Sequence, residues 1–228
     1  AQELGYLKLD DPINKHLPFK GYNPHFPDKE ITIRHLSMHS SSLFYNQFMT
    51  DSLRGMEANN KYRKLGDVLK SFLTPTGQLY KTKNWMKHPP GTYADYSNTG
   101  AALAAYIVEQ SSGIPFEEFT AKQIFNPIGM HNTAWYSGTP DAQMTSYYNS
   151  EKGIPKQEVI AKKDAIYPCG DLVSTPLDLS KFCQMILNKG IANSKKVLSE
   201  QSTKEMLRFK KVKSEDKHKA TIGVFWGK

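Results

Sequence analysis

Residues Pro90–Asn98 read PGTYADYSN, and an alanine-rich stretch follows them as far as Gly113. The Pro-Gly pair predicts a turn, and Tyr93–Tyr96 predict an extended segment. Asn98 can cap a helix that continues to about Ser111, because its side chain can accept a hydrogen bond from the first helical turn. Gly113 suits the end of that helix, because glycine readily adopts the left-handed conformation that closes many helices.

Tyr96 and Asn98 form the one pattern in this stretch that suggests chemistry. Side chains two residues apart in an extended segment point the same way, and a helix start adds the positive end of its dipole. A phenol there can take a proton from a serine, and an amide can hold a substrate carbonyl. The pattern alone is weak, because Tyr147-Tyr148-Asn149 repeats it. From spacing alone we favour a structural interpretation, in which Asn98 caps a helix and Tyr96 fills a core.

Outward from this stretch, helical patterns dominate the chain. Helices or helix-like pieces are predicted over Ile31–His39, Gly66–Leu73, Pro115–Phe125 (ended by Asn126-Pro127), a stretch opened by a capping-box-like Thr175-Pro-Leu-Asp and followed by Gly190, and Ser199–Phe209. Only Thr221–Trp226 reads as a strand. Such a chain is either mostly helical or a piece of something larger.

Composition sets broad limits on function. The 228 residues include 30 Lys+Arg and 22 Asp+Glu, a net charge of +8. This balance suits an anionic partner such as nucleic acid, but a basic solvated surface is the better interpretation. No apolar run approaches the roughly 18 residues of a membrane-spanning helix, and Ala1–Asp10 do not resemble a signal peptide. Cys169 and Cys183 could form one disulfide or remain two free thiols.

Most signatures of catalytic or metal sites are absent from the sequence. It has no G-x-S-x-G, Walker loop, H-E-x-x-H or C-x-x-C. His35 and His39 are spaced for one helix face, but no third zinc ligand lies nearby, so capping or core packing is preferred. The only S-x-x-K is Ser214–Lys217, in a charged stretch that we expect to be exposed and that has no apolar helix face, and we reject it as a nucleophile.

Several segments, taken in order, resemble serine hydrolases related to class C β-lactamases, penicillin-binding D-Ala-D-Ala peptidases and similar esterases. Ile31–Leu43 (ITIRHLSMHSSSL) is similar to the family's I-T-I-R-H-L-L-T-H-T-S-G-L, and Tyr96-Ser97-Asn98 to its Y-x-N motif. Further similar segments are Gly5–Ile13, Ser112-Gly113, Ile124–Met130 (IFNPIGM) and Pro168–Leu179 (PCGDLVSTPLDL). The resemblance covers nearly the whole chain.

The resemblance implies a mechanism and a fold. The family acylates a serine with three motifs, S-x-x-K, Y-x-N and a K-T-G or H-x-G strand. It implies that Tyr96 transfers a proton, that Asn98 positions substrate, and that no cofactor or metal is needed. The implied fold is α+β and helix-rich, a β-lactamase/transpeptidase-like fold of which residues 1–228 cover mainly the helical region and few sheet strands. The chain is then a single partial domain over 1–228, without the S-x-x-K helix and the third-motif strand.

The implied substrate is a β-lactam, a D-amino-acid peptide or an ester, and the chain as given would be catalytically incomplete. The alternative is a non-catalytic module on the same fold that binds a peptidoglycan peptide or acts as a scaffold. A nucleic-acid-binding domain rests on the charge alone and is set aside. The resemblance implies a bacterial, exported protein with a small-molecule or peptide substrate and no membrane segment within these residues; it leaves the oligomeric state open.

Two positions depart from the family pattern. Ser42 stands where the family has a glycine, so a backbone with positive φ there would be strained. Asp171 replaces the second glycine of P-A-G-G. Both substitutions bear on the shape of the site.

Overall fold

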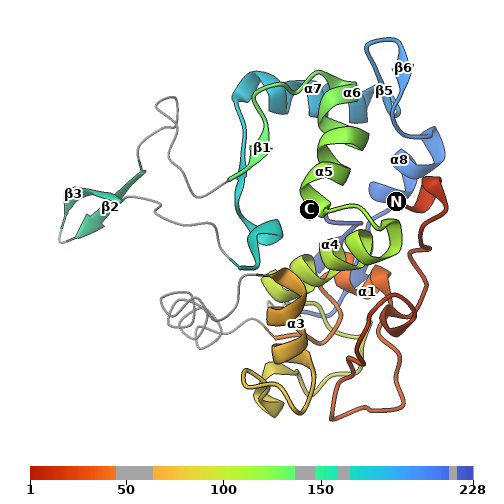
Figure 1. The fold of residues 1–228 in the computed structure, drawn as a ribbon, viewed down its shortest axis with the longest axis vertical. Coiled ribbons are helices and arrows are strands. Elements are labelled where there is room, and N and C mark those ends of the chain that lie inside the picture. Colours follow the sequence, from red (N-terminus) through yellow and green to blue (C-terminus); the bar gives the residue numbers. More distant parts are fainter. Residues whose placement is uncertain (45–63, 137–146, 152, 159–164, 216–219, 228) are drawn as a thin grey trace.

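The structure is a computed structural model that describes residues 1–44, 64–136, 147–151, 153–158, 165–215 and 220–227 (Figure 1). Helices dominate these residues, and the strands are short and form separate two-stranded antiparallel pairs. The predicted helix-rich α+β composition is therefore confirmed.

Within the described residues, three helices pack around the main hydrophobic core. Helix α4 (Asn98–Ser112) contacts both α1 (Ile33–Ser37) and α3 (Leu65–Leu73), as Figure 1 shows. The core is aliphatic and aromatic, and its fully buried side chains include Ile13, Leu36, Val68, Leu69, Phe72, Leu103 and Ile107. Each such side chain contributes on the order of 1.5–3 kcal/mol when it leaves water. Short helical turns lie at η1 (Gln2–Leu4), η2 (Ile13–Lys15), η3 (Thr82–Asn84) and η5 (Tyr167–Cys169).

The cap of helix α4 lies one residue before the predicted one. Ser97 has an extended backbone, and its Oγ accepts a hydrogen bond from the Gly100 N–H at 3.1 Å. Asn98 is already the first helical residue, so the prediction that Asn98 caps the helix is wrong. The predicted end is confirmed, because Gly113 adopts a φ of 69° and its N–H bonds to the Glu109 carbonyl.

The next helix passes through the point at which it was predicted to stop. It comprises α5 (Phe116–Thr120), the π-helical η4 (Ala121–Phe125) and α6 (Asn126–Ile128), and it ends at Gly129 with a φ of 82°. Pro127 lies in the first turn of α6, directly after the π-helical stretch. The shifted hydrogen-bond register there lets the chain pass a residue that has no N–H to donate, so the predicted break at Asn126-Pro127 is wrong.

A second, smaller core lies under α7 (Pro176–Leu187). The predicted helix start is confirmed, because the Thr175 Oγ1 accepts from the Asp178 N–H at 3.2 Å. Met185 and Ile186 are buried, as the predicted apolar stripe requires, and they pack with Phe125, Ile128 and Met130. Helix α8 (Glu200–Met206) is capped by Ser199 and is shorter than the predicted Ser199–Phe209.

The strands pair locally. The pairs are β1 (Ala134–Trp135) with β4 (Leu172–Val173), β2 (Tyr147–Glu151) with β3 (Ile154–Glu158), β5 (Ile191–Ala192) with β6 (Lys195–Lys196), and β7 (Lys210–Val212) with β8 (Ala220–Ile222). The predicted strand Thr221–Trp226 is wrong beyond Ile222, because the chain bends there and Phe225 adopts a φ of 58°. Apolar, β-branched composition alone did not reveal where the pairing ends.

Ion pairs join the two ends of the chain to α1. The Arg34 guanidinium binds the Asp10 carboxylate at 2.6 Å and also the Glu205 carboxylate of α8. The Glu3 carboxylate accepts from the Ser199 N–H at 2.7 Å, which places the N-terminus beside α8 (Figure 1). Neither Cys169 nor Cys183 is part of a disulfide. Across the described residues, no helix combines the length and apolarity that a membrane crossing requires.

Candidate active site

The segment that carries Tyr96 is held along its backbone by two distant parts of the chain. The Ala94 N–H donates to the Lys213 carbonyl at 2.7 Å. The Asp95 N–H donates to the His39 carbonyl at 2.9 Å, and the Ser97 N–H donates to the His39 Nδ1 at 3.2 Å. The predicted extended conformation is confirmed, and it leads directly into α4.

The loop before this segment approaches the 31–43 region very closely. Gly91 has a φ of 82°, and its N–H donates to the Ser40 carbonyl at 2.7 Å. A Cβ at Gly91 would lie 2.7 Å from the His35 Nε2, so only glycine fits there without rearrangement. Ser42 has a φ of 66°, which confirms the predicted strained position, and its Oγ donates to the His88 carbonyl at 2.6 Å. That hydrogen bond offsets part of the strain.

Tyr96 is exposed. Its side chain retains 59% of its accessible surface, so the structural interpretation in which Tyr96 fills a core is wrong. Its ring lies 4.7 Å, centroid to centroid, from the His39 imidazole at an angle of 39°. The Tyr96 ring packs against His39 and is otherwise exposed, so a substrate can reach the phenol.

Asn98 is half-buried in the first turn of α4. Its Oδ1 is buried and has no hydrogen-bond partner among the described residues. Leaving a buried acceptor unsatisfied costs about 1–3 kcal/mol, so such an atom calls for a donor.

A cavity of about 600 Å³ opens beside Tyr96. One wall is the face of α4 that carries small side chains, Ala101, Ala104 and Ala105. The other walls come from both ends of the chain and from the middle, with Leu7, Leu9, Ile33, Phe116, Cys169, Met206 and Phe225 among them. The lining is predominantly apolar. Tyr96 lies on this cavity, and Asn98 is not among its lining residues.

A second cavity, of about 610 Å³, also has Tyr96 in its lining and contains two acidic groups. Asp95 and Glu215 both line it. Burial, and secondarily the nearby Glu215 carboxylate, raise the pKa of Asp95 above its usual value. Tyr96, His39 and Phe225 line both cavities and form the boundary between them.

The two histidines have separate roles. His35 Nδ1 accepts from the Thr32 N–H at 3.2 Å and completes a capping box, which is the capping alternative that the sequence favoured. Helix α1 ends at Ser37, and His39 adopts a φ of 50°, so the two imidazoles do not share a helix face. Over the described ranges, no three His, Cys, Asp or Glu side chains are arranged to hold a metal ion.

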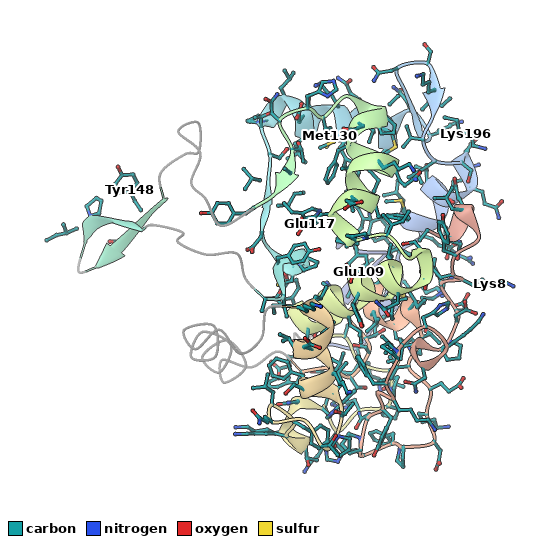
Figure 2. The ribbon with its side chains drawn as sticks, viewed as in Figure 1. Lys8, Glu109, Glu117, Met130, Tyr148 and Lys196 are labelled. Carbon is teal, nitrogen blue, oxygen red and sulfur yellow. The ribbon has the colours of Figure 1, made fainter. Side chains whose placement is uncertain are left out.

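The two look-alike motifs have different surroundings. Tyr148, in the repeated Tyr-Tyr-Asn pattern, is 65% exposed on strand β2, well away from the helices (Figure 2). Ser214, of the S-x-x-K sequence, is half-buried and lines the second cavity, whereas the charged stretch led us to expect it on an exposed surface. Lys217 lies outside the described residues.

Ser111, His16 and Asp11 are connected like a hydrolase triad. Ser111 Oγ lies 2.9 Å from His16 Nδ1, and His16 Nε2 lies 2.9 Å from the Asp11 carboxylate. Ser111 is in the last turn of α4, where free carbonyls make the helix end negative. An oxyanion formed there would be repelled, so this chain of hydrogen bonds serves to tie the N-terminal segment to α4.

Sequence reasoning missed His39 and Phe225 as neighbours of Tyr96. His39 was considered as half of a zinc pair, with capping or core packing preferred, and as one position of the Ile31–Leu43 segment; Phe225 was considered only as part of a strand. Near His39, the sequence offers one feature that could have drawn attention to it, the His39-Ser40-Ser41 (H-x-S) sequence directly after a short helix. Its contact with Tyr96 spans more than fifty residues of chain and has no local signal.

Comparison with known proteins gives a consistent result. A family model described as Beta-lactamase matches residues 1–225. The D-alanyl-D-alanine-carboxypeptidase/endopeptidase AmpH of Escherichia coli is 28% identical, over 82% of this chain and 44% of its own. The teichoic acid D-alanine hydrolase of Staphylococcus aureus is 23% identical, over 81% of this chain and 41% of its own.

The solved structures agree with the sequence comparisons. The octameric penicillin-binding protein homologue from Pyrococcus abyssi superposes with a TM-score of 0.76 at 25% identity, covering 98% of this chain and 48% of that one. A class C β-lactamase in complex with cefoxitin has a TM-score of 0.65 at 20% identity and shows the same fold. The chain thus spans about half the length of the proteins it matches.

Proposed function

Since the Beta-lactamase family description covers residues 1–225, the chain belongs to that family, and we propose that it forms part of a serine hydrolase that cleaves an amide or ester through an acyl-enzyme. In this proposal Tyr96 transfers the proton and Asn98 positions the substrate. The observation that carries the proposal is the exposed Tyr96 phenol, braced against His39 at the boundary of two cavities.

The proposal places the nucleophile serine and its lysine on a segment outside residues 1–228. The cavity of about 600 Å³ along α4 supports this part, because it is apolar and adjoins Tyr96, and because the small side chains of α4 would let a helix approach closely. Contiguous apolar surface of this kind marks a site where a ligand, a partner or another element packs.

The proposed reaction has two halves. The serine oxygen attacks the substrate carbonyl carbon, and its proton passes to the lysine and Tyr96 pair while backbone N–H groups bind the oxyanion. The carbon–nitrogen or carbon–oxygen bond then breaks, and the leaving group takes the proton. Water attacks the acyl-enzyme in the second half, with the same groups removing its proton and returning it to the serine.

Substrate and location follow from the relatives only as proposals. The names of two relatives refer to D-alanine, so D-alanyl peptides and D-alanyl esters are the substrates to test first. We also propose that the protein works outside the cytoplasm, where cell-wall substrates of this class occur.

The decisive experiment uses the full gene product that contains residues 1–228. A fluorophosphonate probe and a fluorescent penicillin should acylate a serine in an S-x-x-K sequence before Gly5. Tyr96→Phe should slow acylation by roughly 10²–10⁴-fold. Tyr148→Phe is the matched control, because it makes the same change in the look-alike motif, and Ser214→Ala tests the other serine; both should acylate at the wild-type rate.

Several results would overturn the proposal. A Tyr96→Phe variant as fast as Tyr148→Phe would remove Tyr96 from the mechanism. Robust labelling of the 228-residue chain alone, or loss of labelling in Ser214→Ala, would show that the nucleophile was misplaced. A full gene product that lacks the serine and lysine but binds D-alanyl peptides would instead establish the non-catalytic binding module.

A further inference from the structure

His39 contacts the residue on each side of Tyr96 as well as Tyr96. Its carbonyl accepts from the Asp95 N–H at 2.9 Å, and its Nδ1 accepts from the Ser97 N–H at 3.2 Å. Its ring packs on the Tyr96 ring with the centroids 4.7 Å apart. One residue therefore constrains the backbone before Tyr96, the backbone after it, and the aromatic ring between.

Backbone geometry explains how one residue can do this. In an extended segment the N–H groups of residues 95 and 97 point to the same edge, so both can reach one neighbour. His39 follows the end of α1 in the left-handed region, with a φ of 50°. That turn brings its carbonyl and its side chain to the same edge of the segment. Histidine and asparagine are among the few residues that adopt this conformation at modest cost.

The imidazole is itself held in place. Phe225 lies against it edge-on, with centroids 6.1 Å apart and an angle of 85°. The Phe225 N–H donates to the Ser37 carbonyl at 2.8 Å, which anchors Phe225 to the end of α1. His39 thus packs against two aromatic rings, those of Tyr96 and Phe225.

The protonation state supports an acceptor role. Because Nδ1 accepts the Ser97 N–H, the neutral ring carries its proton on Nε2. Burial lowers the pKa of His39 below its usual value. The imidazole therefore stays a neutral acceptor at neutral pH.

We propose that His39 is the positioning residue of the site: it sets the direction of the Tyr96 phenol and the start of α4 without touching the substrate. This inference rests on the proposed function for its catalytic meaning, but the geometry of Tyr96 can be measured independently of any activity. Catalytic groups that lose their alignment by about 1 Å lose on the order of 10²-fold in rate.

Two substitutions separate the contributions of His39. His39→Asn places an amide oxygen close to the Nδ1 position and tolerates positive φ, so it keeps the Ser97 hydrogen bond and loses the ring contact. His39→Leu loses both. Far-UV circular dichroism and urea unfolding establish that each variant is folded before any comparison.

The first measurement uses the full gene product labelled with 3-fluorotyrosine, with the Tyr96 resonance assigned by Tyr96→Phe. The ¹⁹F resonance of Tyr96 should differ from its urea-unfolded position in the wild type. It should move most of the way toward that position in His39→Leu and part of the way in His39→Asn. A Tyr96 resonance unchanged in a folded His39→Leu variant would overturn the proposal.

The second measurement uses the full gene product and its acylation kinetics. His39→Leu should lower the acylation rate constant about 10- to 100-fold with little change in the half-saturating probe concentration, and His39→Asn should recover most of that loss. A change confined to the half-saturating concentration would overturn a positioning role. If Tyr96→Phe is harmless, the proposed function fails, and the fluorine measurement still decides whether His39 positions Tyr96.

Discussion

Replacing Ser97 with alanine should destabilise the chain measurably, because it removes the cap of the helix that follows Tyr96. The Ser97 Oγ accepts the Gly100 N–H at 3.1 Å, and Ser97 is only 1% exposed. Loss of a serine cap costs about 0.5–2 kcal/mol in typical helices. Here the Gly100 N–H stays buried without a partner, which costs about 1–3 kcal/mol. Both figures describe the same lost bond, so we expect a decrease of about 1–3 kcal/mol in the free energy of unfolding.

The assay is urea unfolding of the 228-residue chain, followed by far-UV circular dichroism. The midpoint should fall while the m-value stays constant, because the surface exposed on unfolding is unchanged. The thermal midpoint should fall by about 2–4 °C for each kcal/mol lost. Ser97→Thr should recover most of the stability, because threonine keeps the hydroxyl. Ser180→Ala, at an exposed position on α7, is the control and should stay within about 0.5 kcal/mol of wild type.

Two outcomes would refute this reasoning. A loss below about 0.5 kcal/mol in Ser97→Ala would mean that the hydroxyl does not cap α4 in solution. A Ser97→Thr variant as unstable as Ser97→Ala would assign the loss to the shape of the side chain and not to the hydrogen bond.

Three further predictions concern the core, the ion pairs and the turn. Leu103→Ala, at a fully buried position, should cost about 2–5 kcal/mol in urea unfolding, whereas Leu187→Ala, 81% exposed, should change stability by less than about 0.5 kcal/mol. The Arg34 guanidinium lowers the pKa of Glu205 below its usual 4.5. This pair therefore stabilises the chain above about pH 4.5, and the stabilisation is lost as the pH falls further. Arg34→Met should flatten that part of a plot of unfolding free energy against pH, and an unchanged plot would contradict the prediction. Gly91→Ala, at a φ of 82°, should cost at least about 1–2 kcal/mol by thermal unfolding, and a neutral result would mean that the turn relaxes.

Local hydrogen bonding explains which helices could be predicted. The start of α7 was predicted because Thr175 caps a residue three positions away, and the end of α4 because Gly113 tolerates a positive φ. The start of α4 was off by one residue because Ser97 and Asn98 can both cap. Ser97 caps the helix because its N–H bonds to the distant His39, which keeps the Ser97 backbone extended.

The strand at the C-terminal end shows the opposite case. Residues 221–226 have strand-forming composition, but pairing with β7 stops at Ile222. Phe225 then donates to the Ser37 carbonyl with a positive φ, which a strand would not allow. Strand residues need a partner across the sheet, and composition carries no information about where that partner ends.

The sequence was sufficient to identify the family and to name Tyr96 and Asn98 as candidates, because residue type and motif order are written in the chain. Spacing alone favoured a buried Tyr96, and the structure exposes it. Segments from positions 1–9, 33–39, 96–108 and 198–225 come together around Tyr96. They form its contact with His39, the boundary with Phe225 and the apolar cavity. Helix caps and turns depend on residues within about four positions of one another, so they can be read locally. The surroundings of the phenol depend on contacts between residues far apart in the chain, and only the packing of the whole chain decides those.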